Sequence, residues 1–63
     1  MKALLLVVQL LNGTPNGDPR VSVIAADDCS YEMRVVSGVN RANHDARTGV
    51  QYVGVCQVIE STN

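Results

Sequence analysis

The sequence predicts an all-β protein, or a β-rich one with a single short helical turn, built on a small antiparallel sheet of about four strands in two hairpins. Two observations carry this prediction. Apolar runs of strand length open and close the chain, at residues 3–11 and 50–60, and turn residues follow the first. Residues 31–40 alternate between apolar and polar side chains, as a half-buried strand does. With 63 residues, the chain makes one small domain, residues 1–63.

The composition predicts a weak core and self-association. The chain is 46% hydrophobic and 17% charged, which is not the composition of a disordered protein. It has no Phe or Trp, the side chains that bury the most area. A domain of this size buries only about 60% of its unfolded surface, so it has more apolar side chains than one copy hides easily. We therefore expect a homodimer or a higher oligomer.

Residues 3–11 admit three interpretations. Lys2 and the apolar run after it resemble the start of a signal peptide, which would make the protein secreted. Gln9 interrupts that run, however, and no small-x-small cleavage site follows residues 1–12. A membrane span needs about 20 apolar residues, so this segment is too short to be one. We expect a buried strand, with a short buried helix and a signal peptide as the alternatives.

Residues 12–19 are dense in turn residues and lead into a second strand at 20–28. Two Asn-Gly pairs tolerate positive φ, and two prolines fix φ. A phosphate-binding loop would end in Gly-Lys-Ser/Thr before a helix, and this segment does not. Pairing the two strands across the loop matches their apolar positions. The predicted pairs are Leu10 with Val21, Val8 with Val23, and Leu6 with Ala25.

Residues 31–40 and 50–60 are expected to form the second hairpin. The later strand is apolar on both faces, which favours the centre of the sheet or a contact with another subunit. This pairing sets Cys56 opposite Arg34 and leaves Cys29 on the order of 16 Å away, beyond the ~7 Å limit for a disulfide. We therefore predict that both cysteines are free within one chain, as in a reducing cytoplasm.

Few residues combine into a catalytic or metal site. Zinc needs about four ligands, and Cys29, Cys56 and His44 lack the usual close spacing. A Cys–His nucleophile pair is formally available, but the predicted hairpin separates its members. Asp27 and Asp28 would point to opposite faces of a strand, so we interpret them as turn residues, with Asp28 capping the segment after it. The sequence therefore predicts no enzyme, no cofactor and no metal.

The polar segment VNRANHDARTG, residues 39–49, is the best candidate for a binding site. Asn40 or Asn43 could cap one helical turn that ends near Gly49. The basic side chains of this segment would then be three residues apart and could bind a carboxylate, a phosphate or an acidic patch on a protein. The polar face of residues 31–40 forms a second patch, and a solvated loop is the alternative. The expected contact residues are Arg41, His44, Asp45, Arg47, Glu32 and Arg34.

We expect a non-enzymatic small protein that binds and modulates another protein, as an inhibitor does, of the kind found among phage (viral) and mobile-element accessory proteins. Its partners would be a second copy of itself and a host or target protein in the cytoplasm, with no membrane. A net charge of −1 and only two aromatic rings argue against nucleic acid. Two alternatives stay open: a small oligomeric binder of nucleotides, nucleic acid or small ligands through residues 41–47, and a structural subunit of a larger assembly.

Overall fold

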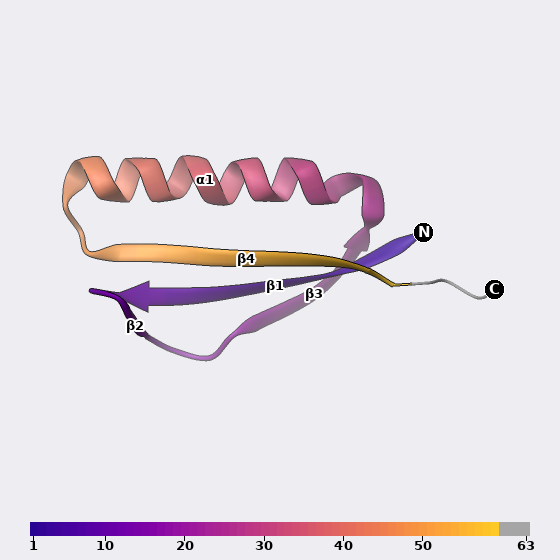
Figure 1. Cartoon of the computed structure of the whole chain (residues 1–63), viewed down its shortest axis with the longest axis horizontal. Coiled ribbons are helices and arrows are strands. Elements are labelled where there is room, and N and C mark those ends of the chain that lie inside the picture. Colours follow the sequence, from indigo (N-terminus) through magenta and orange to yellow (C-terminus); the bar gives the residue numbers. More distant parts are fainter. Residues whose placement is uncertain (60–63) are drawn as a thin grey trace.

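The computed structural model describes residues 1–59 and contains a four-stranded antiparallel sheet and one long helix (Figure 1). The β-rich antiparallel fold predicted from the sequence is confirmed. The last residue of the predicted strand 50–60 lies outside the described residues. In chain order the elements are β1 (Lys2–Leu11), β2 (Thr14–Pro15), β3 (Arg20–Ala25), the 3-10 turn η1 (Ala26–Asp28), α1 (Cys29–Ala46) and β4 (Val50–Ile59).

β1 is the central strand, so residues 3–11 form the predicted strand and not the alternative helix. On one side β3 pairs with its first part and β2 with its end, while β4 pairs along its whole length on the other side. A continuous apolar run suits a strand with neighbours on both sides. Ala3 and Leu5, which are 0% and 7% exposed, are the buried hydrophobic residues among those described. The segment that resembles a signal peptide therefore supplies the core of the domain.

The first hairpin is present, but its predicted register is wrong. Asn12 and Gly13 alone make the turn, with φ values of 51° and 83° that match a two-residue type I′ hairpin turn. β2 follows at once, and the rest of the loop joins it to β3. As a result Leu6 pairs with Val21 instead of Ala25. The shift is an even number of residues, so each strand keeps its apolar face on the same side.

The largest correction concerns residues 31–40, which lie in α1 and not in a strand. Without that strand there is no second hairpin, and β4 pairs with β1 instead. Tyr31, Val35 and Val39 are spaced four residues apart, which places them on one side of a helix as well as on one face of a strand. The alternation in this segment therefore fits both structures, and the tertiary contacts of α1 decide between them.

α1 ends in left-handed backbone, somewhat earlier than predicted. Arg47 has φ 55°, and its N–H donates to the carbonyls of Asn43 and His44 at the end of the helix. Gly49 has φ 79°, and the side chain of Asn12 fills the space that a Cβ there would need. The N–H of Asn12 donates to the carbonyl of Gly49 at 2.8 Å. The contacts between Gly49 and Asn12 therefore connect the segment after α1 to the turn of the first hairpin.

α1 runs along β4, at one edge of the sheet (Figure 1). The side-chain amide of Asn40 donates to the carbonyl of Tyr52 at 2.8 Å and accepts from the N–H of the same residue at 2.7 Å. Met33 and Val36 lie over Gly54, where a Cβ would come within 3.1 Å of the Met33 Cε. β4 is therefore an edge strand with a helix beside it, and its predicted place at the centre of the sheet is wrong.

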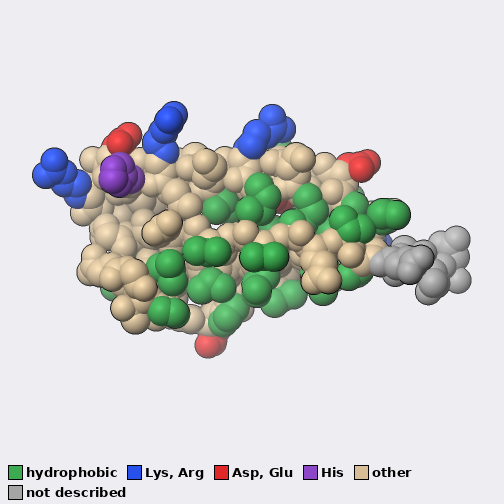
Figure 2. Space-filling view, in the orientation of Figure 1, with side chains coloured by type: hydrophobic (Ala, Val, Ile, Leu, Met, Phe, Trp, Pro, Cys, Tyr) green, Lys and Arg blue, Asp and Glu red, His purple; other side chains and the backbone are tan. Residues whose placement is uncertain are grey.

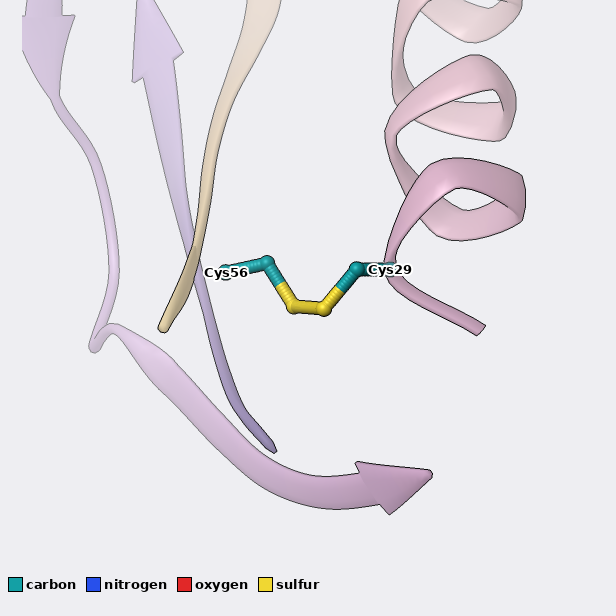
Figure 3. The surroundings of a disulfide bond; sticks show 2 residues. All are labelled: Cys29 and Cys56. Atoms are coloured by element: carbon teal, nitrogen blue, oxygen red, sulfur yellow. A yellow bond between two sulfur atoms is a disulfide. The ribbon is translucent and has the colours of Figure 1, made fainter. Parts of the chain in front are cut away.

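A disulfide joins the start of α1 to β4 (Figure 3). The Cα atoms of Cys29 and Cys56 are 5.9 Å apart. The prediction of two free cysteines is wrong, because it depended on a strand pairing that residues 31–40 do not make. Asp28 occupies the N-cap position, but its side chain makes no capping hydrogen bond. The covalent bond therefore holds the first turn of the helix in place of a side-chain cap.

Candidate functional site: the open sheet face and the polar helix

α1 leaves one face of the sheet uncovered. Side chains alternate between the two faces along each strand. Cys56 is bonded to α1, and Tyr52 lines a groove with valines of α1, so both side chains point to the α1 side. The intervening residues of β4, with their partners on β1 and β3, point to the other side. We call this set the open sheet face. Its apolar middle consists of Leu4, Leu6, Val8, Val21, Val23, Val53 and Val55, and its ends carry Lys2, Gln51 and Gln57.

The open sheet face is apolar and accessible to solvent. Val21 and Val23 are 62% and 58% exposed, and Val55 on the opposite strand is 53% exposed. Figure 2 shows hydrophobic side chains gathered over the strands, whereas Lys and Arg side chains lie along the outer margin of α1. A contiguous exposed apolar patch marks a surface of interaction in a soluble protein. The open sheet face is therefore our first candidate site.

The six contact residues predicted from the sequence all belong to one element and its end. The predicted loop is helical over most of its length, so the two predicted patches merge into one surface. The residues that lie in α1 or directly after it are Glu32, Arg34, Arg41, His44, Asp45 and Arg47.

The structure brings three of these residues together on the outer side of α1. Arg34, Arg41 and Asp45 stand at positions i, i+7 and i+11, which fall on one side of a helix, and all are exposed. Glu32 is only partly exposed and stands at a different helical angle. Arg47 lies beyond the helix, in the left-handed conformation. The outer side of α1 is thus a second candidate surface, and it is polar.

A shallow groove lies between α1 and the sheet, on the face opposite the open sheet face. Its lining residues are Val7, Arg20, Val35, Val36, Val39 and Tyr52. A neighbouring hollow shares three of them and extends over Gln9, Asp18 and Ser22. Neither hollow is lined by residues 41–47, the segment that the sequence suggested for a small ligand.

Neither a cluster of metal ligands nor a Cys–His pair is present among residues 1–59. Within residues 1–59, no three His, Cys, Asp or Glu side chains gather as metal ligands would. Cys29 and Cys56 are bonded to each other, so neither provides a thiol to pair with His44.

The fold and its surfaces define a small β-rich protein with an antiparallel sheet and one helix at its edge. No protein-family model, curated protein or solved structure matches this chain. Among the residues described, none of the helical segments has both the length and the apolar character to cross a bilayer.

Sequence reasoning missed the open sheet face as a binding surface. The signal was present, because alternate positions of the first two strands are apolar and a helix can cover only one face of a sheet. The prediction of a strand at residues 31–40 concealed the uncovered face. In a sheet without a helix both faces are equally exposed, so neither can be identified as the binding surface.

Proposed function

We propose that the protein is a non-enzymatic binding protein that acts as an assembly of its own copies. The open sheet face carries this proposal. The chain exposes 4867 Å², whereas a folded monomer of its mass exposes about 3,900 Å². The excess of roughly 1,000 Å² is larger than the ~800 Å² that each partner buries in a standard interface. These areas favour a second copy of the chain as the partner that covers the open sheet face.

The shape of the chain supports the same proposal. Its radius of gyration is 13.1 Å, whereas about 10.6 Å is typical of a compact domain of this length. Two copies that pack their open sheet faces together form a sandwich with sheets ~10 Å apart. Lys2, at one end of the open sheet face, is its only charged side chain within the described strands, so packing through the middle of the face buries no charge. The flat single copy thereby becomes half of a compact dimer.

In such a dimer the outer sides of both helices stay accessible. Arg34 and Arg41 present two guanidinium groups, which bind carboxylates in a planar, two-pronged geometry. We propose that this side contacts and modulates another protein with an acidic surface, as inhibitors among phage and mobile-element accessory proteins do. The assembly would then use the sheet for self-association and the helix for its target.

The disulfide bears on where the protein acts. The cytoplasmic location predicted from the sequence depended on free cysteines. Disulfides persist in oxidising compartments and are rare in the reducing cytosol. The pairing of Cys29 with Cys56 therefore supports an oxidising compartment as the site of action.

Val55→Lys tests the use of the open sheet face. Val55 is 53% exposed in the single copy, so the lysine can be accommodated before assembly, but it places a charge between the two sheets. We expect the mass measured by light scattering to fall by half. Ser37→Lys adds the same charge at an exposed position of α1 and should leave the mass unchanged. An unchanged mass for Val55→Lys would overturn the proposed dimer.

Arg34→Glu/Arg41→Glu tests the outer side of α1. Wild type and this variant serve as bait side by side in affinity capture, with bound proteins identified by mass spectrometry. We expect the variant to lose at least one acidic protein that wild type retains, while its oligomeric mass stays the same. If both baits retain the same proteins in the same amounts, the outer side of α1 is not the contact surface.

A further inference from the structure

The direction of the backbone groups shows that β3 has a free outer edge. The N–H of Ala26 donates to the carbonyl of Met1 at 3.0 Å, which continues the β1–β3 ladder. In an antiparallel ladder, successive residues point their main-chain groups alternately toward the partner strand and away from it. The groups of Val21, Val23 and Ala25 therefore point away from β1. Within residues 1–59, no strand pairs with this side of β3.

The outer edges of β4 and β3 differ in how their outward main-chain groups are bonded. At β4, the outward main-chain groups of Tyr52 are bonded by Asn40, so α1 covers part of that edge. No comparable side-chain bond reaches β3 from the described residues. An exposed edge strand with unpaired main-chain groups is a template for another strand. β3 also carries Val21 and Val23, the most exposed valines of the sheet.

We propose that β3 pairs antiparallel with β3 of a second copy, around a twofold axis through Val23. Val23 then lies opposite its own copy, and Val21 lies opposite Ala25. These are the residues whose main-chain groups point outward, so each pair can exchange hydrogen bonds. Arg20 meets Ala26 in this register, and no like charges face each other within β3 (Arg20–Ala25). The pairing also keeps both open sheet faces on the same side of the continuous sheet.

The edge pairing deepens the proposed function. Its twofold axis is perpendicular to the sheet, whereas the axis of the face-to-face dimer runs between the two sheets. Two perpendicular twofold axes that meet generate a closed assembly of four copies. The proposed tetramer requires the face-to-face dimer of the proposed function. The pairing of β3 with β3 does not require that dimer.

Ala25→Pro tests the edge. The φ of Ala25 is −65°, the value that proline requires, and its N–H points outward, so the fold of one copy tolerates the ring. The ring removes a donor and blocks the approaching strand. Ala25→Ser has a similar size and keeps the N–H, so it is the matched control. The oxidised full chain is used throughout, with the Cys29–Cys56 bond checked by mass spectrometry.

Light scattering should give four copies for wild type and for Ala25→Ser, and two for Ala25→Pro. Val55→Lys should also give two copies, and Ala25→Pro/Val55→Lys should give one. A mass of Ala25→Pro equal to that of Ala25→Ser overturns the edge pairing. An unchanged mass for Val55→Lys instead overturns the face-to-face dimer and leaves the edge pairing standing.

A second form of the edge test avoids any change of side chain. In a synthetic chain, N-methylation of Val23 removes its outward donor and keeps the isopropyl group on the open sheet face. We expect this chain to assemble as two copies, like Ala25→Pro. Four copies would overturn the edge pairing even if Ala25→Pro failed to fold.

Discussion

Cys29→Ser/Cys56→Ser is expected to remove about half of the stability of the protein. The disulfide closes a loop of 27 residues, and a bond that closes such a loop contributes about 3.5 kcal/mol in the chain-entropy model. The core of so small a domain yields only about 3–5 kcal/mol. Here that core has just two buried hydrophobic residues, Ala3 and Leu5, among those described. The disulfide and the core therefore contribute comparable amounts to the free energy of unfolding.

Thermal unfolding followed by circular dichroism measures this effect. At about 4–8 °C for each kcal/mol, we expect the midpoint of unfolding to fall by roughly 14–28 °C. Wild type in excess reductant is the control and should unfold at the same temperature as the double variant. A double variant that unfolds within a few degrees of oxidised wild type would show that the disulfide does not stabilise the fold in this way.

Asn40→Ala is expected to have the next largest effect. Asn40 bonds both main-chain groups of Tyr52, and both are partly buried between α1 and β4. Removal of the amide leaves a donor and an acceptor without a partner, which costs about 2–3 kcal/mol. Asn43→Ala is the matched control. Its amide bonds Val39 and Thr48 at exposed positions, so we expect a loss below about 1 kcal/mol.

Denaturant unfolding and amide hydrogen exchange together check this expectation. The amide of Tyr52 should exchange faster in Asn40→Ala, because that N–H loses its acceptor, and should be unaffected in Asn43→Ala. Equal losses of stability in the two variants, or unchanged protection of the Tyr52 amide, would show that Asn40 does not hold α1 against β4.

The strands of the sheet could be predicted from the sequence because their signals are local. The run at residues 3–11 and the run at 50–59 are long and apolar, and both are strands. Asn12-Gly13 is a strong hairpin signal. Residues 12–19 resemble one continuous loop, but Asn12 and Gly13 alone make the turn, and this difference displaces the predicted register with β3. Because the register between β1 and β3 shifts by an even number of residues, each side chain stays on its predicted face of the sheet, and the apolar surface is unchanged.

The helix could not be predicted from the same kind of signal. Residues 31–40 contain several β-branched valines and Gly38, which lower helix propensity and favour a strand. What favours α1 is non-local: the bond from Cys29 to Cys56, the clamp of Asn40 on Tyr52, and the absence of a side chain at Gly54. None of these pairings is visible before the strands are placed.

The candidate site was predicted in part. The residues expected to contact a partner lie on an exposed surface, although on a helix and not at a loop tip. Self-association was inferred from composition alone, and the structure adds two surfaces that it could use. These are the open sheet face and the outer edge of β3, which the sequence could not indicate without the correct partners for β1.

The mass of the oxidised wild-type protein in solution, measured by light scattering at tens of micromolar, tests the central claim most directly. The claim is that the open sheet face and the β3 edge are covered by further copies of the chain. We expect a mass four times that of the 6.7 kDa chain. A mass of one chain would contradict the claim, because both surfaces would then remain exposed in the folded protein.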